Sequence, residues 1–256
     1  MLPTVRHQHI LEALRNHGSV SAAALRQTFQ TTAMTVWRDL KALEELGLLR
    51  RTRGGACLQN RFPGEPNYEA KNQNAFGAKR RIAALAAQEF VREGDAIVLE
   101  GGTTVSALIN FLPAERISVL TNSLPVALRV RAQRPGLPAL VAGGWMSQVS
   151  GNTCGPEALR SMAKWQAAVC FISATAFDAV VGPSDPNPLE IEAKRALAAC
   201  ARRVVLLLDS SKFDQRSAAV TLHPRRIDAL VTDADPPAPI RALLNRYSIR
   251  VCIARE

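Results

Sequence analysis

The sequence predicts an α/β protein in two parts, an N-terminal winged helix-turn-helix and a C-terminal α/β domain with a mainly parallel sheet. Three observations predict this division. Residues 1–57, the head, contain helix-start signals, a tight turn and a Gly-Gly hairpin. Residues 58–75 form a polar, proline-containing stretch without a clear period, which is typical of a linker. In residues 76–256, the body, short apolar runs alternate with helical patterns.

The charge of the chain points to a polyanionic partner. Its 32 Lys and Arg residues outnumber its 22 Asp and Glu residues and give a formal net charge of +10. This balance favours nucleic acid or a membrane surface as partner. The head carries 8 basic and 4 acidic residues, so its net charge of +4 is more concentrated than that of the body.

Composition excludes several classes of protein. With 47% hydrophobic and 21% charged residues, the chain can bury a core and is not of the disordered type. No apolar run is long enough to cross a bilayer, and the start, MLPTVRHQHI, lacks the apolar region of a secretory signal, so we expect a cytoplasmic protein with no membrane partner. The 5 cysteines are scattered and form no C-x-x-C pair, so we expect no disulfide framework, no metal site and no cofactor.

Two helices are expected before the turn of the head. Thr4 is placed to cap the first, and Ser21 to cap a short second helix over residues 22–28. Apolar side chains at helical spacing give both helices a core face: Ile10, Leu11, Leu14, Leu25 and Phe29.

A third helix and a hairpin complete the predicted head. Thr32 is a good cap for the third helix, whose core positions at i, i+4 and i+7 are Val36, Leu40 and Leu43. Two short strands, LLRRTR and ACL, can follow and join at Gly54-Gly55 as a wing.

The predicted head has the chemistry of a DNA-binding surface. Small and polar side chains at the start of the third helix suit the major groove, Arg38 can fork onto guanine or a phosphate, and wing arginines can neutralise the backbone. Asp39 is expected to brace an arginine or a helix end rather than to contact DNA. The alternative is a three-helix packing domain with a solvated basic face. The candidate DNA-binding residues are Ser21, Thr32, Ala33, Met34, Thr35, Trp37, Arg38, Lys41, Arg51, Arg53 and Gly54.

The body is expected to hold a parallel sheet covered by helices. Its continuous apolar runs read as strands buried on both faces, and they span 96–99, 117–120, 139–142, 169–172, 204–208 and 229–231. Helical patterns lie between them, at 79–90, 104–111, 125–134, 189–201 and 239–247.

Polar or glycine-rich clusters follow four of these predicted strands. In open α/β sheets ligands bind beyond the carboxyl ends of the strands, and glycines with free N–H groups and threonine hydroxyls suit a phosphate. For the first cluster alone, a tight βα turn with a capping threonine is the alternative. The clusters are Glu100, Gly101, Gly102, Thr103 and Thr104; Thr121, Asn122 and Ser123; Gly143 and Gly144; and Asp209, Ser210, Ser211 and Lys212.

The head closely resembles that of the DeoR/GlpR family of bacterial sugar-metabolism regulators. The matching segments are Ser19-Val20, Phe29 to Leu40, Leu43-Glu44 and Arg53 to Ala56. Where the family shows Ser-x-x-Thr-Ile-Arg-Arg-Asp-Leu, this chain has Thr32 for the serine and Trp37 for the first arginine. Trp37 either packs on a sugar–phosphate edge or lies against the wing, and we favour packing on the sugar–phosphate edge.

The body is also similar to that family's sensor domain. The family landmarks Asp-x-Gly-Thr-Thr, Thr-Asn-Ser, Gly-Gly, Glu-x-x-x-Lys and Asp-x-Ser-Lys correspond to 100–104, 121–123, 143–144, Glu190/Lys194 and 209–212. The resemblance implies a sugar-phosphate-sensing domain related in fold to ribose-5-phosphate isomerase and the CoA transferases. It makes Glu190, Lys194, Ser211 and Lys212 candidate effector-binding residues. The alternatives are a solvated Lys212 and an exposed Lys194 paired i, i+4 with Glu190.

The chain departs from the family pattern at three places in the body. Glu100 replaces an aspartate, Ser173-Ala174-Thr175-Ala176 replaces a Gly-Ala-Asn-Gly turn, and Trp145 follows the Gly-Gly pair. Trp145 either lines the ligand site or packs in the core. These changes concern the identity of the ligand more than its existence.

The sequence favours a regulator over an enzyme. A sugar-phosphate isomerase on the same fold is the competing hypothesis, but the acidic turn that would tune a catalytic base is absent from residues 173–176. We therefore expect a sequence-specific DNA-binding transcriptional regulator, a repressor of a carbohydrate-catabolism operon controlled by a phosphorylated sugar or related metabolite. It would bind double-stranded operator DNA as a homodimer or homotetramer, because two-fold symmetry matches paired half-sites.

Overall fold

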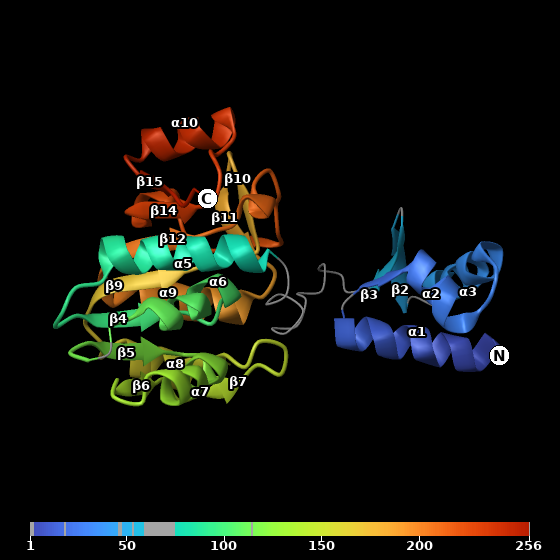
Figure 1. Ribbon diagram of the computed structural model, residues 1–256, viewed down its shortest axis with the longest axis horizontal. Helices are drawn as coiled ribbons and strands as arrows, with labels where there is room; N and C mark the ends of the chain where they lie inside the picture. The colour runs from blue at the N-terminus through green and yellow to red at the C-terminus, as the bar shows by residue number, and fades with distance from the viewer. Residues whose placement is uncertain are drawn as a thin grey trace. The chain divides into compact units, whose positions relative to one another are not determined.

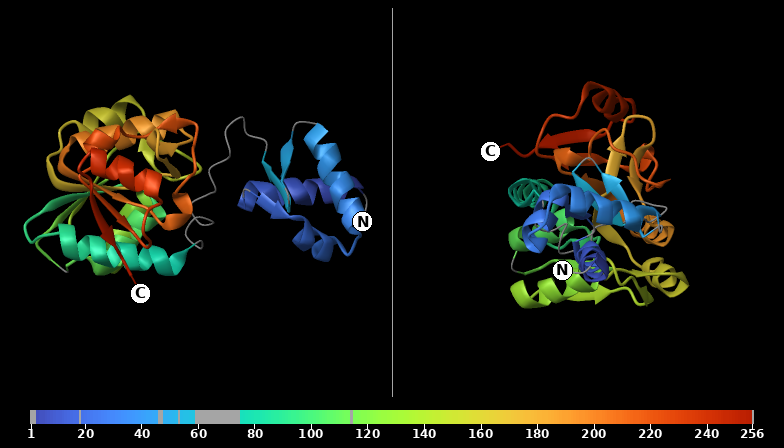
Figure 2. Two further views of the ribbon diagram at one scale, coloured as in Figure 1. Left: turned by 90° about the horizontal axis from the view of Figure 1, so that it is seen from above. Right: turned by 90° about the vertical axis from the view of Figure 1, so that its right-hand side faces the viewer.

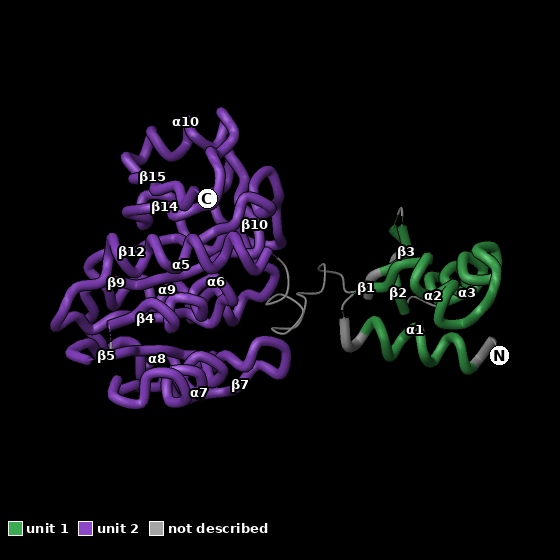
Figure 3. The backbone as a smooth tube through the Cα atoms, in the orientation of Figure 1, with its two compact units in different colours: residues 1–70 green, residues 71–256 purple. Residues whose placement is uncertain are grey.

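The computed structural model describes residues 3–17, 19–45, 48–52, 54–58, 75–113 and 115–255. The chain divides into two compact units, residues 1–70 and 71–256 (Figure 3). Most of the predicted linker, at 59–74, lies outside the described residues.

The head contains the three helices and the wing that the sequence predicts. The helices are α1 (Pro3–His17), α2 (Ala22–Phe29) and α3 (Ala33–Glu45). The wing strands are β2 (Leu49–Thr52) and β3 (Gly55–Leu58), and β3 also pairs with β1 (Ser19–Ser21), which the sequence did not predict (Figure 1). One prediction is wrong, because α1 begins at Pro3 and Thr4 therefore lies inside the helix rather than at its cap.

A small apolar core holds these elements together. Eight of the described side chains are buried in it: Ile10, Leu14, Leu25, Val36, Leu40, Leu43, Leu49 and Ala56. Gly55 permits the approach of β1 to β3, since a Cβ at this position would lie 1.9 Å from the carbonyl oxygen of Val20. The wing is thus fixed to the start of α2 as well as to the end of α3.

The body is built on a seven-stranded parallel sheet in the order β15-β14-β12-β9-β4-β5-β6. The six predicted strands are confirmed with small shifts in their bounds, and β15 is an addition. The strands are β4 (Ala96–Leu99), β5 (Ser118–Thr121), β6 (Ala139–Val141), β9 (Ala167–Ile172), β12 (Ala201–Leu207), β14 (Ala229–Thr232) and β15 (Arg250–Ile253).

Helices cover both faces of this sheet (Figure 2). One apolar core joins the sheet to α5 (Phe76–Phe90), α6 (Thr103–Ser106), the 3-10 helix η1 (Ala107–Phe111) and α7 (Leu124–Gln133). The other core joins it to α8 (Pro156–Met162), α9 (Pro188–Ala199) and α10 (Ala238–Arg246). Successive strand residues enter opposite cores, which explains the continuous apolar runs in the sequence.

Smaller elements lie at the edge of the sheet where the parallel strands end, and at one end of the body. β7 (Trp145–Met146) and β8 (Thr153–Cys154) form a hairpin, and β10 (Ala176–Asp178), β11 (Gly182–Asp185) and β13 (Ala219–Val220) form a second antiparallel sheet. Two short 3-10 helices lie on either side of β13 in the sequence, η2 (Ser210–Lys212) before it and η3 (Pro224–Arg226) after it. Among the described residues, no helix is long and apolar enough to span a membrane.

The strand order reverses between β4 and β9. From β4 the chain proceeds outward through β5 to β6, then returns to β9 and proceeds the other way through β12, β14 and β15. Ligands of open α/β sheets bind at such a reversal, outside the carboxyl ends of the strands. The residues that follow β4 and β9 are therefore the first place to look for a site.

Candidate functional sites

Two of the three predicted caps of the head are confirmed, those at Ser21 and Thr32. Ser21 Oγ accepts a hydrogen bond from Ala24 N at 3.4 Å at the start of α2. Thr32 Oγ1 accepts one from Thr35 N at 3.2 Å and lies 2.9 Å from Thr35 Oγ1. Both threonine hydroxyls are thus gathered at the N-terminal end of α3.

The outer face of α3 carries the predicted contact residues. Ala33, Met34, Arg38 and Lys41 are exposed, and Met34 has 72% of its surface accessible, which is unusual for a methionine that serves only to pack. Thr35 is half-buried. The helix therefore presents apolar, polar and basic side chains together, as major-groove recognition requires.

Trp37 lies against the core of the head rather than fully in solvent. It is half-buried and packs against the apolar cluster of α1, α2 and α3. This contact is closer to the alternative in which Trp37 lies against the wing, since Leu49 and Ala56 of the wing strands belong to the same cluster.

The wing is tied to α3 through Arg51. Its backbone N donates to Glu44 Oε1 at 2.8 Å and its Nε donates to Glu44 Oε2 at 2.6 Å. The backbone and side-chain hydrogen bonds from Arg51 lower the pKa of Glu44. Gly54 is exposed at the tip of the hairpin, and Arg53 lies outside the described residues.

Asp39 is bound to an arginine, as expected, and does not face outward. Arg6 donates to it from Nε at 2.7 Å and from Nη2 at 3.0 Å, and Asp39 is only 4% exposed. Burial acts to raise the pKa of Asp39, but the hydrogen bonds and charge of Arg6, with the contact from His7, bring it below its ordinary value.

In the body, Glu100 connects the ends of β4 and β9 across the strand reversal. Its Oε2 accepts hydrogen bonds from Gly102 N at 3.0 Å, Ser173 N at 3.2 Å and Ser173 Oγ at 3.1 Å. A Cβ on Gly102 would lie 1.9 Å from Ser173 Oγ, so a glycine is required at this position. Two departures from the family pattern, Glu100 and Ser173, are thus direct partners.

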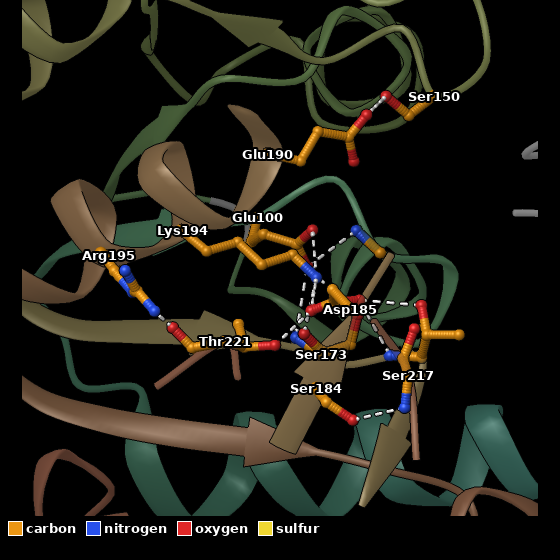
Figure 4. Close-up of polar contacts among 12 residues, drawn as sticks. Glu100, Ser150, Ser173, Ser184, Asp185, Glu190, Lys194, Arg195, Ser217 and Thr221 are labelled. Atoms are coloured by element: carbon orange, nitrogen blue, oxygen red, sulfur yellow. Dashed lines mark hydrogen bonds and ion pairs between the residues drawn. The ribbon is translucent and has the colours of Figure 1, made fainter. Parts of the chain in front are cut away.

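Lys194 is buried among carboxylates (Figure 4). Its Nζ donates to Asp185 Oδ2 at 2.8 Å and to Ser173 O at 2.9 Å, and lies 3.6 Å from Glu100 Oε1. With 5% exposure, Lys194 is not the solvated helix lysine that the sequence left open as an alternative. It lies at the strand reversal, next to the Gly-Gly-Thr-Thr segment.

Asp185 holds Lys194 from the small antiparallel sheet. Its Oδ1 accepts from Thr175 N at 2.9 Å and Thr175 Oγ1 at 2.8 Å, and its Oδ2 also accepts from Thr221 Oγ1 at 2.6 Å. Burial opposes ionisation, yet the charge and hydrogen bond of Lys194 lower the pKa of Asp185. The carboxylate is therefore ionised and saturated with donors.

The polar residues after β5 bind the strand to its neighbours. Thr121 Oγ1 donates to Leu99 O at 2.6 Å and accepts from Ser123 N at 3.0 Å. Asn122 Nδ2 donates to Thr153 O at 3.0 Å. All three residues of the Thr-Asn-Ser cluster are buried. The β7–β8 hairpin packs against them, since its residue Asn152 forms a backbone bridge with Ser123.

The hairpin also approaches the Gly-Gly-Thr-Thr segment. A Cβ on Gly101 would lie 1.8 Å from Asn152 Oδ1, so the absence of a side chain lets the two segments meet. Thr103 and Thr104 follow in α6 and are buried. Ser150 Oγ, in the same hairpin, donates to Glu190 Oε1 at 2.6 Å, and Glu190 is 5% exposed.

The Gly143-Gly144 pair lies at the exposed end of β6. Gly144 has a φ of +121°, and a Cβ there would lie 2.8 Å from Cys154 O. Trp145 is 71% exposed, so the interpretation that it packs in the core is wrong.

The fourth cluster lies further along the sheet edge. Ser211 and Lys212 are in η2, after β12, and Ser211 Oγ donates to Asp209 while Ser210 N donates to Asp233 at 2.7 Å. Because β9 lies between β12 and β4, only the first three clusters follow neighbouring strands.

Sequence reasoning missed several residues that complete the network. Asp185 and Asn152 lie in short hairpins and Thr221 directly follows the two-residue strand β13; these segments have no apolar period, and nothing in their sequence marks them. Ser173 was noted only as a change in a turn. Its position directly after a predicted strand was a usable signal, since every other strand-end cluster was found that way.

Comparison with known proteins places both parts of the chain. The family model for the DeoR-like helix-turn-helix domain matches residues 6–62, and that for the DeoR C terminal sensor domain matches residues 75–234. The glycerol-3-phosphate regulon repressor of Escherichia coli K12 is 27% identical over 98% of this chain and 99% of its own. The HTH-type transcriptional regulator GolR of Listeria innocua is 29% identical over 91% of each chain.

Among solved structures, the chain is similar to ribose 5-phosphate isomerase from Plasmodium falciparum. The TM-score is 0.39 and the identity 14%, over 53% of this chain and 52% of that one. A likeness of this degree says nothing about activity.

A winged helix-turn-helix with an exposed recognition face, in one chain with an α/β sensor domain, defines a DNA-binding transcriptional regulator. The chain belongs to the DeoR family.

Proposed function

We propose that this regulator is a cytoplasmic repressor of a carbohydrate-catabolism operon, released from or held on its operator by a phosphorylated sugar or a related metabolite. The observation that carries the DNA half of the proposal is the capped helix α3, with Thr32, Arg38 and Lys41 on a face that the core leaves exposed. The name of the glycerol-3-phosphate regulon repressor supports the control by a phosphorylated metabolite. Since the relatives are regulators, we propose no catalytic activity.

The functional division that we propose is a DNA-binding domain at 1–57, a linker at 58–75 and a sensing and oligomerisation domain at 76–256. A homodimer or homotetramer would match paired operator half-sites. Base edges would be read from α3 and phosphates neutralised from the wing. The DNA-contacting residues would be Ser21, Thr32, Ala33, Met34, Thr35, Trp37, Arg38, Lys41, Arg51, Arg53 and Gly54.

Replacing Arg38 by alanine tests the recognition helix. We expect its affinity for a duplex selected from random sequence by the wild-type protein to fall by about 5–150-fold, which corresponds to roughly 1–3 kcal/mol for one forked base contact. The measurement is a titration by fluorescence anisotropy at several salt concentrations. Arg131→Ala removes an exposed arginine from α7 in the body and serves as the control. Unchanged affinity and base preference for Arg38→Ala would refute the assignment of α3.

The effector would bind at the carboxyl ends of β4, β5 and β6, where three of the four clusters meet. Residues of these clusters and of α9 would surround it: Glu100, Gly101, Gly102, Thr103, Thr104, Thr121, Asn122, Ser123, Gly143, Gly144, Glu190 and Lys194. Ser211 and Lys212 would take part only if the ligand extends past β9. Lys194 is already held by Asp185 and Ser173, so it would act on the ligand through its charge or by exchanging partners.

A panel of sugar phosphates tests the sensor. A ligand that binds the folded state at 100 times its Kd adds about 2.7 kcal/mol of stability, which raises the melting temperature of the body by several degrees. We expect at least one phosphorylated compound, with glycerol 3-phosphate included, to do so and to change the affinity for the selected duplex. The unphosphorylated sugars are the control. If no phosphate in the panel changes either property, the sensor proposal fails.

A further inference from the structure

The head contains a buried ion pair between two helices that the sequence places far apart. Arg6 in α1 and Asp39 in α3 are separated by 33 positions and meet through two hydrogen bonds, Nε to Oδ2 at 2.7 Å and Nη2 to Oδ1 at 3.0 Å. His7 Nε2 lies 3.2 Å from the same Oδ1. Arg6 is 9% exposed and Asp39 4% exposed.

The pair adjoins the residues that face outward. Asp39 directly follows Arg38 and lies beside the core positions Val36 and Leu40 of α3. Successive residues of a helix project about 100° apart, so the direction of Asp39 determines that of Arg38. In α1, Arg6 lies one turn before Ile10 and continues its buried face.

The pair supplies an orientation that the apolar core does not. The apolar stripe of α3 turns Leu40 toward Ile10 and Leu14 of α1, but hydrophobic contacts are non-directional and set this rotation only coarsely. A forked arginine–carboxylate pair fixes both distance and rotation. A buried ion pair contributes little net stability compared with an apolar pair of the same size, so specification of geometry is the stronger reason for its presence.

We infer that Arg6 is a positioning residue for DNA recognition. Through Asp39 it holds α3 at the rotation at which Arg38 and its neighbours meet base edges, and it thereby sets the ratio of specific to non-specific DNA affinity. Arg6 itself does not contact DNA in this role, since its guanidinium is occupied by Asp39.

Replacing Asp39 by asparagine tests the inference, because electrostatics and positioning predict opposite changes in the affinity for the selected duplex. The change removes one negative charge from the head, so electrostatics alone would tighten binding to any DNA. We expect instead that the full-length variant binds the selected duplex about tenfold or more weakly, while its affinity for an unrelated duplex of equal length stays equal or rises. Glu12→Gln makes the same charge change at an exposed site of α1 and should leave the affinity ratio unchanged.

Two outcomes would overturn the inference. In the first, Asp39→Asn binds both duplexes more tightly, which would mean that Asp39 only repels DNA. In the second, it weakens both equally, which would mean that the pair serves folding alone.

Arg6→Lys keeps the proposal testable if the head of Asp39→Asn does not fold. Lysine retains the charge and loses the fork, so the affinity ratio should fall while the slope of log affinity against log salt stays that of the wild type. If Arg6 instead contacted a phosphate directly, Arg6→Lys would keep both the salt slope and the ratio of specific to non-specific affinity of the wild type. An unchanged affinity ratio would therefore contradict the inference. Arg6→Gln separates the two roles further, because loss of a phosphate contact would reduce the slope by about one.

Discussion

Replacing Lys194 by methionine is expected to destabilise the body by about 3–5 kcal/mol, because it leaves buried carboxylates without their cation. Asp185 and Glu100 are 3% and 2% exposed, and the ammonium group lies within 2.8 Å and 3.6 Å of their oxygens. Asp185 has its pKa lowered by Lys194, so it stays ionised at neutral pH when the partner is present. Without Lys194, burial favours the protonated form of Asp185, and the free energy of burying or protonating this carboxylate is subtracted from the stability of the folded body.

The measurement is urea and thermal unfolding of the full chain. For a domain of this size, the expected loss corresponds to a decrease of about 10 °C in melting temperature. Lys164→Met, at an exposed lysine before β9, is the matched control and should have no measurable effect. The double variant with Asp185→Asn should be less destabilised than Lys194→Met alone, since it removes the orphaned charge. A melting temperature within a degree of the wild type for Lys194→Met would show that the pair is not a constraint on folding.

Leu40→Ala is expected to weaken DNA binding by destabilising the head while leaving the body folded. Leu40 is fully buried in a core of eight described side chains. The truncation costs about 2–5 kcal/mol. A domain of this size has about 3–9 kcal/mol of stability in total, so one such change consumes a large share of it.

Calorimetry or circular dichroism of the full chain should show the unfolding transition of the head at a lower temperature in the variant, while the transition of the body keeps its temperature. Leu48→Ala makes the same chemical change in the head at a side chain that is 43% exposed, and it should retain DNA binding. If Leu40→Ala lowered the melting of the body as well, the two units would not be independent, contrary to their division in the structure.

The sheet and the recognition head could be predicted because their signals are local. Strands buried on both faces give unbroken apolar runs, and side-chain caps such as Thr32 mark helix starts within four residues. β15 escaped detection because its Arg250–Ile253 segment is short, polar at its start and at the edge of the sheet. The hairpin of β10 and β11 escaped because a Gly-Pro-Ser-Asp strand has no apolar period.

The strand-end residues of the candidate site could be predicted from the sequence, but their hydrogen-bond partners could not. Asp185 reaches Lys194 only because a hairpin folds back over the sheet, which no spacing in the sequence encodes. The sequence did contain a signal for the burial of Lys194. Glu190 and Lys194 lie on the same face of α9 as Leu197, which is part of the core. The i, i+4 spacing of Glu190 and Lys194 suggested a surface ion pair, but a core face has the same spacing.

The contact of Glu100 with Ser173 joins residues 73 positions apart, at the seam where the sheet reverses its strand order. A ribosome adding about 5–20 residues per second needs roughly 4–15 s to pass from one to the other, and longer to reach Lys194. The described head ends at Leu58, before the first strand of the parallel sheet begins. During synthesis, the whole described head is therefore made well before the chain contains Ser173 and Lys194, which close the polar network at this seam.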